Sequence, residues 1–215
     1  MIKVCCLLIS IFFTVNSFAQ NSSSTSQNTQ SVESNLPLSE VENQKPTADD
    51  IFIDAERNER SGNLNEALTL FGKAAFAFNS DKKLGKYASA LLRMSNIHLM
   101  LNRYTEAEQV ALNVALKVYA RMGSKVGQMA TYSQLAKVYF AANKLPQSMW
   151  FYTQQGILAN LINNKASYID SVLGIAAIKI KKKQFYLAAK DLSRAEILAK
   201  NSKIIQFEQQ FKNTR

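Results

Sequence analysis

The chain has 215 residues, a formal net charge of +10, one histidine and two cysteines. That length allows one ordinary domain or a short repeat array to bury most of its apolar surface. The excess of lysine and arginine favours acidic partners, such as anionic lipid, acidic protein patches or nucleic acid, but does not indicate a fold. A single histidine excludes histidine-rich metal sites and catalytic arrangements that need a second histidine.

The first 19 residues have the pattern of a secretory signal peptide. Lys3 precedes an apolar run over residues 4–15, and small residues before Gln20 provide a cleavage site after Ala19. The run is shorter than the roughly 20 residues that a membrane-spanning helix needs, and an uncleaved anchor is the alternative. Cleavage would remove both cysteines and leave no disulfide in the exported chain. We therefore expect an exported protein that is periplasmic or associated with the cell envelope.

Residues 20–46 are dominated by Ser, Asn, Gln and Thr. Such a segment cannot bury enough surface to offset its ordering entropy, so the composition predicts a disordered polar linker. The character changes at Thr47, where Asp49 and Asp50 are placed to favour the positive end of a helix dipole. The predicted organisation is a signal peptide over 1–19, a linker over 20–46, a helical repeat domain over 47–200, and a C-terminal capping helix and tail over 201–215.

The stretch from Met129 to Gly156 predicts two amphipathic helices joined by a polar turn at residues 142–144. Apolar and small residues between 123 and 142 recur with a period nearer 3.6 than 2, which is typical of a helix. The chain has only three prolines. Pro146 falls in the first turn of its helix, where the missing N–H has no cost. Weaker copies of this pair of helices precede and follow it.

Aligning the turns of these copies shows a repeat of about 40 residues. Gly62, Asn102, Asn143 and Lys183 are separated by 40, 41 and 40 residues, and the flanking positions then agree. Two columns hold small residues, as expected where paired helices approach closely, and two hold large residues that fill the space beside them. The small columns are Ala55, Ser95, Ala136, Ala176 and Ala67, Ala107, Ser148, Ala188; the large columns are Ile51, Leu91, Tyr132, Val172 and Leu64, Tyr104, Leu145, Phe185.

These columns resemble the tetratricopeptide-repeat (TPR) family. The third copy carries the resemblance best, through Tyr132, Leu135, Ala136, Tyr139, Asn143, Leu145, Ser148 and Tyr152. The usual repeat has 34 residues, so this chain resembles an extended variety with repeats of about 40. The resemblance implies an all-α, right-handed α-solenoid of about four helical hairpins plus a C-terminal capping helix. The first copy is degenerate, as a solvent-facing end repeat would be, and the fourth has Lys179 in place of an aromatic residue.

The resemblance also implies where a partner binds. In this family the first helix of each hairpin lines a concave groove, and its polar positions contact a bound peptide. The candidate binding residues are Arg93 and Asn96 in the second repeat and Gln134 and Lys137 in the third. The members of each pair share a helix face, and their guanidinium, ammonium and amide groups suit a carboxylate or an extended backbone. The family's carboxylate-binding arrangement spans three successive repeats and is not reproduced here, because the fourth repeat has Gly174 and Ala177 at the corresponding places. Ordinary solvated polar positions are the alternative interpretation of the four residues.

Several features that catalysis requires are absent from the sequence together. Carboxylate pairs such as Glu106 and Glu108 fall on polar helix faces, and the glycines are scattered rather than gathered in a phosphate-binding loop. His98 occupies the column of Tyr139, which favours a packing role. Trp150 lies outside the columns and is interpreted as a packing residue in preference to a recognition hot spot. The sequence therefore predicts a non-catalytic protein that needs no cofactor or metal.

Charge is distributed unevenly along the chain. Residues 179–215 have a net charge of +7, whereas Thr47–Arg60 has a net charge of −3. Solvated lysine faces are the ordinary interpretation. Docking of the basic end on an anionic membrane surface and head-to-tail association into a homo-oligomer are the alternatives. Nucleic acid is disfavoured because no basic motif is interleaved with aromatic residues.

We predict a protein–protein interaction scaffold or adaptor of the bacterial cell envelope that binds a protein or peptide in the groove of its repeat array. The alternative is an extracytoplasmic sensory domain that passes a conformational change to a separate partner.

Overall fold

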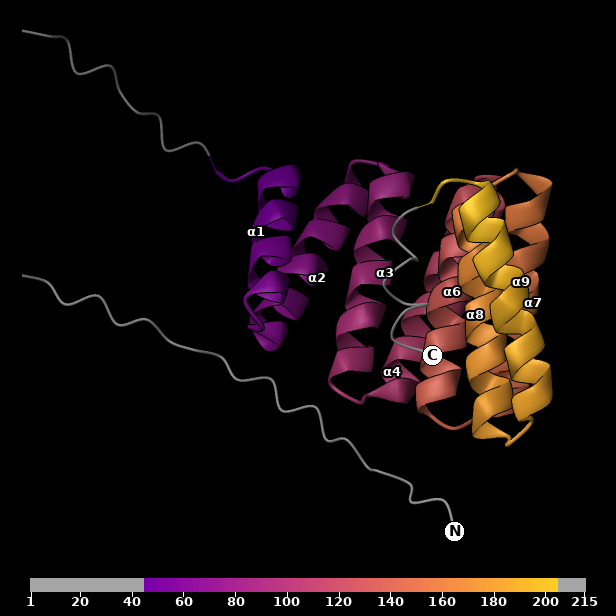
Figure 1. Cartoon of the computed structure of the whole chain (residues 1–215). Helices are drawn as coiled ribbons and strands as arrows, with labels where there is room; N and C mark the ends of the chain where they lie inside the picture. The colour runs from indigo at the N-terminus through magenta and orange to yellow at the C-terminus, as the bar shows by residue number, and fades with distance from the viewer. Residues whose placement is uncertain (1–44, 205–215) are drawn as a thin grey trace, which may run out of the picture. The chain divides into compact units, whose positions relative to one another are not determined.

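The computed structural model describes residues 45–204, and all the regular structure in that part of the chain is helical (Figure 1). The elements in chain order are α1 (Ala48–Arg60), α2 (Leu64–Ser80), α3 (Leu84–Met100), α4 (Tyr104–Glu108), the π-helical segment η1 (Gln109–Ala115), α5 (Leu116–Arg121), α6 (Lys125–Ala141), α7 (Leu145–Leu161), α8 (Lys165–Lys181) and α9 (Phe185–Asn201). Because α4, η1 and α5 follow one another without a break, they form one helix. The predicted all-α solenoid of four hairpins is therefore confirmed.

Three of the predicted segments fall wholly or mostly outside the described residues. The signal peptide and nearly all of the linker lie before residue 45, and the capping segment lies beyond residue 204 apart from its first four positions. The predicted start of the helical part coincides with a helix cap. The Thr47 hydroxyl accepts a hydrogen bond from the Asp50 amide at 3.2 Å, and the Asp50 carboxylate accepts one from the Thr47 amide at 2.9 Å.

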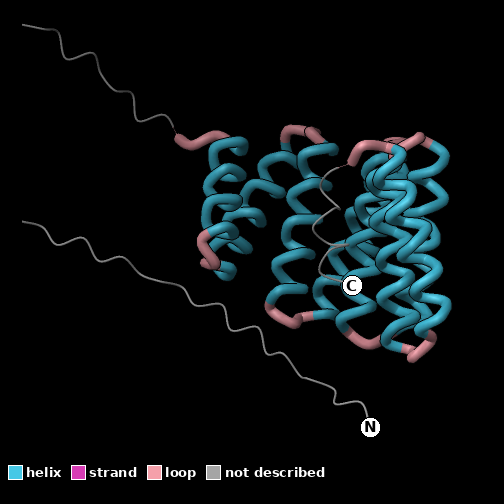
Figure 2. Tube along the Cα trace, in the orientation of Figure 1, coloured by secondary structure: helices cyan, strands magenta, loops and turns pink. Residues whose placement is uncertain are grey.

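The helices form two layers. The first helices of the hairpins are α1, α3, α6 and α8; ion pairs join α1 to α3, and α6 packs against both α3 and α8. The second helices are α2, the composite helix from α4 to α5, α7 and α9. The turns within hairpins lie at one end of the helices, and the turns between hairpins lie at the other (Figure 2).

Each short turn that follows a described helix contains one residue in the left-handed conformation. In each turn the amide that follows this residue donates to a carbonyl five residues earlier, as in the Asn143 turn, where the Lys144 amide donates to the Tyr139 carbonyl at 2.8 Å. The left-handed residues are Gly62, Lys82, Asn102, Gly123, Asn143, Asn163, Lys183 and Lys203. The turn column recognised in the sequence is therefore the set of left-handed residues within hairpins, with glycine or asparagine at three of its four positions.

The spacing of 41 residues between the second and third turns has a structural cause. Helices α2, α3, α6, α7, α8 and α9 each have 17 residues, whereas the composite helix runs from Tyr104 to Arg121 and has one more. The π-helical segment η1 absorbs that extra residue, because a π-bulge adds one residue to a helix without displacing the turns beyond it.

The two small columns face each other inside each hairpin. All eight of their members are buried, with at most 2% of the residue exposed. Where one column supplies serine, the other supplies alanine. Ser95 Oγ donates to the Ala107 carbonyl at 2.8 Å, and Ser148 Oγ donates to the Ala136 carbonyl at 2.8 Å. A serine on either side of the seam thus bonds the backbone opposite it, so that burying the hydroxyl has little cost.

We predict that the chain tolerates deletion of Asn113, an exposed residue of η1. The deletion would leave a helix of the same length as its neighbours, and the melting temperature should change by only a few degrees. Deletion of Thr153, exposed in the regular helix α7, is the matched control. It rotates the following residues by about 100° and should cost more than about 3 kcal/mol. Equal losses in thermal and urea unfolding of the two variants would contradict the assignment of η1 as the site of the extra residue.

Candidate functional site

Arg93 and Asn96, the predicted binding residues of the second repeat, are occupied by carboxylates of α1. Arg93 Nη2 lies 3.1 Å from Glu56 Oε1 and 2.8 Å from Glu59 Oε2, and Asn96 Nδ2 donates to Glu59 Oε1 at 3.0 Å. The Arg93–Glu59 contact is electrostatic, because its geometry does not make a hydrogen bond to Oε2. The Glu59 side chain is only 9% exposed. These contacts close the seam between α1 and α3.

The two predicted residues of the third repeat have different environments. Gln134 Nε2 donates to Ser95 Oγ at 3.4 Å across the seam between α6 and α3. Lys137 is exposed and lines an open recess between α6 and α8. Of the four residues predicted from the sequence, Lys137 lines this recess, whereas the other three bond side chains of neighbouring helices.

The recess has a volume of about 620 Å³ and lies between the parallel helices α6 and α8. One face of α6 and the first turns of α8 form its two sides, and a side chain of α7 reaches it from the second layer. Its lining residues are Val126, Met129, Ala130, Ser133 and Lys137 of α6, Gln155 of α7, and Asn164, Ala166, Ser167 and Asp170 at the start of α8. Apolar groups and both signs of charge thus share one cavity.

A hydrogen-bonded set of side chains surrounds Asp170. Its Oδ2 accepts from Gln155 Nε2 at 2.8 Å and from Ser133 Oγ at 3.2 Å, and Gln155 Nε2 also donates to the Ser167 carbonyl at 3.1 Å. The Asp170 carboxylate and the Ser167 carbonyl, which both accept from Gln155 Nε2, fix the orientation of the Gln155 amide. Its Oε1 is buried and has no hydrogen-bond partner among the described residues. A buried carbonyl oxygen without a donor is costly, so the site holds an acceptor that the fold itself does not satisfy.

The repeat shows that packing does not require glutamine at position 155. Counted back from the turns between hairpins, its position belongs to a column whose other members are alanines. Ala74, Ala115 and Ala195 are each 0% exposed, and Gln155 is 2% exposed. The fold therefore accepts alanine at this depth in the first, second and fourth hairpins and carries a long amide in the third.

Sequence reasoning missed Gln155 and Asp170, although each left a signal. Asp170 is the only carboxylate between Glu108 and Asp191 in the sequence, which is unusual isolation for an acidic residue on a helical surface. The signal of Gln155 is its place in the alanine column, which is visible only when the extra residue of the second hairpin is assigned to η1.

Gly174 is the residue of the fourth repeat that corresponds to Arg93 and Gln134, and its identity has a packing cause. A Cβ added to Gly174 would overlap the ring carbons of Tyr152, so this position must be glycine for the Tyr152 ring to pack. Burial and the nearby Asp170 carboxylate raise the pKa of Tyr152 to about 12. Packing, and not binding, thus sets the identity of this residue.

Two smaller cavities lie where α7, α8 and α9 meet. Their volumes are about 330 and 360 Å³, and both are lined by Tyr168 and Arg194. Arg194 Nη2 donates to the Tyr168 hydroxyl at 2.6 Å, so the main polar groups that they share are already paired. Within residues 45–204 we find no group of three or more His, Cys, Asp or Glu side chains arranged to hold a metal ion. None of the helices in that range is long and apolar enough to cross a membrane.

His98 and Trp150, both interpreted from the sequence as packing residues, differ in their exposure. The His98 side chain is half-buried in α3, and its Nδ1 has no hydrogen-bond partner among the described residues. Burial lowers the pKa of His98, with the Glu106 carboxylate opposing that shift. Trp150 is 53% exposed, but its ring makes edge-to-face contacts with Phe151 and Tyr132, at centroid distances of 4.7 and 6.3 Å.

Solved structures of repeat proteins resemble this arrangement of helices. BtubC (BKLC) from P. vanneervenii superposes with a TM-score of 0.66 at 15% identity, over 76% of this chain and 68% of that one. The TPR-like repeats of a putative kinesin light chain of Podosopora anserina superpose with a TM-score of 0.61 at 14% identity, over 73% and 76%. MamA from Desulfovibrio magneticus RS-1 gives 0.55 at 16% identity, over 72% and 76%. The chain has a TPR-like repeat fold. No family model and no curated protein matches the sequence, so the likeness extends to the fold alone.

We predict that Arg93 and Lys137 differ in their importance for stability. Arg93→Ala leaves the nearly buried Glu59 carboxylate without its countercharge, and because Arg93 is about one third exposed the loss should be about 1–3 kcal/mol. Lys137→Ala should change the free energy of unfolding by less than about 0.5 kcal/mol, because no described residue pairs with it. Urea unfolding of the two variants measures the difference. An Arg93→Ala variant as stable as the parent would show that the seam ion pairs do not support the fold.

A second prediction concerns pH. Because the pKa of His98 is lower in the folded chain than its ordinary value of about 6.5, the unfolded chain binds a proton first as the pH falls. The contribution of neutral His98 to stability is therefore complete above a pH of about 6.5 and declines below it. Unfolding at pH 7.5 and pH 5.5 should show a smaller acid-induced loss for His98→Asn than for the parent. An identical loss in the two proteins would contradict this prediction.

Proposed function

We propose that this protein is a non-catalytic scaffold or adaptor that binds an extended segment of a partner protein in the recess between α6 and α8. The TPR-like fold supports a role in protein–protein interaction, since stacked helical repeats present long binding surfaces. The observation that carries the proposal is the buried, unpartnered Oε1 of Gln155 in a column of alanines.

The groups in the recess indicate the chemistry of the bound segment. Lys137 offers an exposed ammonium group, which suits a carbonyl or carboxylate of the ligand. The Asp170 carboxylate, which Gln155 Nε2 holds in place, is an acceptor and suits an N–H donor. Met129 and Ala130 form an apolar wall beside them. Alternating donors and acceptors next to an apolar wall are what an extended peptide backbone with one apolar side chain requires.

The state of the other seams explains why binding would be confined to this place. The seam between α1 and α3 is filled by Arg93 and its two glutamates, and Gln134 bonds Ser95 across the seam between α3 and α6. We infer that Arg93, Asn96 and Gln134 hold neighbouring hairpins together, and that Lys137 is the binding residue among the four predicted from the sequence.

The cellular setting is part of the same proposal. The charged start, short apolar run and small residues of positions 1–19 support export by a signal peptide cleaved near Ala19-Gln20. We propose that the chain acts in the periplasm or at the cell envelope. Its partners are then other envelope proteins, bound without a cofactor.

Selection of a random-peptide display library against the full chain tests the proposal. Peptides that bind the parent should bind Lys137→Ala and Asp170→Asn at least about tenfold more weakly in fluorescence anisotropy, since each variant removes a charged hydrogen-bonding group. Lys73→Ala, on the exposed face of α2, is the matched control and should not alter affinity.

Gln155→Ala separates binding from folding. The substitution introduces the alanine that the other three hairpins have at this position. It removes two donated hydrogen bonds but also one buried acceptor without a partner, and these effects oppose each other. The free energy of unfolding should therefore stay within about 1 kcal/mol of the parent. Affinity for the selected peptides should nevertheless fall about tenfold. If the selected peptides bound all these variants and the parent equally, the recess would not be the site.

A further inference from the structure

The turn between α8 and α9 combines lysines with exposed apolar side chains. Lys181, Lys182 and Lys183 are all exposed. Directly after them, Phe185 is 63% exposed, Tyr186 is 81% exposed and Leu187 is 44% exposed. Large apolar groups in this number seldom gather on a solvated turn without a function.

The other hairpins show that the fold does not require this composition. Phe185 belongs to a large column, but Tyr186 and Leu187 do not. The positions equivalent to these two are exposed and mostly polar in every earlier hairpin, namely Asn65 and Glu66, Thr105 and Glu106, and Pro146 and Gln147. The positions equivalent to Lys182 and Lys183 hold Ser61 and Gly62, Leu101 and Asn102, and Ala142 and Asn143. Both the positive charge and the apolar surface are therefore specific to the fourth turn.

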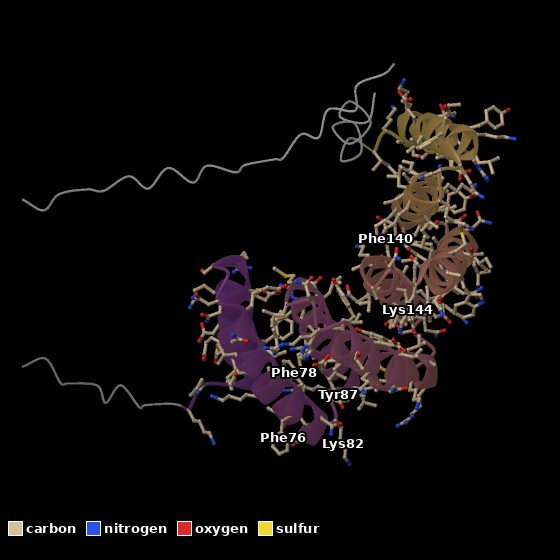
Figure 3. The ribbon with its side chains drawn as sticks, turned by 90° about the horizontal axis from the view of Figure 1, so that it is seen from below. Phe76, Phe78, Lys82, Tyr87, Phe140 and Lys144 are labelled. Carbon is tan, nitrogen blue, oxygen red and sulfur yellow. The ribbon has the colours of Figure 1, made fainter. Side chains whose placement is uncertain are left out.

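Contacts of Lys179 and Lys181 join the turn to neighbouring helices, whereas the ammonium groups of Lys182 and Lys183 have no acidic partner among the described residues. The Lys179 ammonium is paired with Asp191 at 2.5 Å, which joins α8 to α9. Lys181 Nζ lies 4.7 Å from the centre of the Phe140 ring and donates to the Phe140 carbonyl at 3.4 Å; Phe140 lies on α6 (Figure 3). Among the described residues, neither Lys182 nor Lys183 forms an ion pair. Lys182 and Lys183, which form no ion pair with a described residue, thus lie on a turn that contacts tie to α6 and α9.

We propose that the α8–α9 turn docks the protein on an anionic lipid bilayer. Lysine ammonium groups are attracted to acidic headgroups, and each contributes roughly 1 kcal/mol near such a surface. Tyrosine and phenylalanine favour the boundary between headgroups and acyl chains, where an apolar ring and a polar tip are both accommodated. Lys182 and Lys183 would contact the headgroups, while Tyr186 and Leu187 enter the boundary region. This docking goes beyond the proposed peptide binding and uses none of the residues of the recess.

Vesicle co-sedimentation of the full chain tests the proposal. The probes are vesicles of phosphatidylcholine alone and of phosphatidylcholine with about one third phosphatidylglycerol. The variant Lys182→Ala with Lys183→Asn transplants the turn of the third hairpin, so it should fold. It should bind the anionic vesicles about thirtyfold more weakly than the parent, since two lysines are lost.

A control variant with the same loss of charge is available at the opposite end of the helices. Lys82 and Lys83 form the turn between α2 and α3, where Lys82 points outward (Figure 3). Lys82→Asn with Lys83→Asn transplants the Asn163-Asn164 turn and should leave vesicle binding unchanged. Any membrane affinity of residues 1–19 is common to all variants and cancels in the comparison.

Fluorescence reports whether the apolar residues enter the bilayer. In a Trp150→Phe background, Tyr186→Trp places the sole tryptophan on the turn. Its emission should shift to shorter wavelength on anionic vesicles and be quenched by brominated lipid. Tyr186→Thr with Leu187→Gln should weaken binding to the same vesicles by about tenfold or more, because apolar contact with the boundary region is lost.

Three results would overturn the proposal. One is equal weakening by the two lysine pairs, which would indicate diffuse attraction by net charge. Another is a tryptophan emission of the Tyr186→Trp variant that does not change with anionic vesicles. In the last, the parent self-associates at low salt, and Lys182→Ala with Lys183→Asn abolishes this association without affecting vesicle binding. That result would assign the turn to contact with a second copy of the chain. Loss of vesicle binding with peptide binding retained would support docking and leave the recess as the separate binding site.

Discussion

The left-handed residue that closes each helix is the constraint on which the rest of the structure depends. It lets a turn of three residues reverse the chain, and the amide that follows it reaches back to a carbonyl five residues earlier. Lysine and asparagine adopt this conformation at six turns, at a cost of about 1 kcal/mol or more each relative to glycine. The cost is tolerated because the turns fix the lengths of the helices, and equal helices can pack in register.

The seams follow from that register. Helices of equal length bring the two small columns opposite each other in every hairpin, and their backbones then lie close enough for a serine on one helix to bond a carbonyl on the other, as Ser95 and Ser148 do. Apart from α1, the shorter first helix of 13 residues, the composite helix from α4 to α5 is the one that departs from the common length among the described helices. Its extra residue would rotate the following positions by about 100° in a regular α-helix, and η1 removes that rotation so that Ala111 and Ala115 both stay buried.

The sequence was sufficient to predict the fold because turns and seams are local, periodic features. Gly62 and Asn102 mark left-handed positions by their chemistry, and alanine or serine marks close helix contacts. The partners of Arg93 were beyond the sequence, because Glu56 and Glu59 lie more than 30 residues away and meet it only once the relative rotation of α1 and α3 is known. The same polar helix face was therefore predicted to bind a ligand when it binds a neighbouring hairpin.

Gln155 escaped recognition for a different physical reason. Aligned from the turns within hairpins, its column contains Val114 and so looks merely apolar and variable. Aligned from the turns between hairpins, which lie beyond the π-bulge, the column contains Ala115 and becomes alanine throughout except for Gln155. The correct alignment of a repeat on the far side of a bulge requires knowledge of where the bulge lies, which the sequence does not contain.

A repeat protein supplies its own controls, because each hairpin shows what packing alone requires at a given depth. A residue that departs from its column at an energetic cost therefore indicates function more strongly than an exposed polar residue does. Gln155 departs by burying an acceptor, at a cost of about 1–3 kcal/mol. It also lies on α7, in the second layer, and reaches between α6 and α8 to orient Asp170. The first helices present the surface of the recess, but the group that sets its chemistry comes from behind them, so binding at this site depends on the packing of three successive helices.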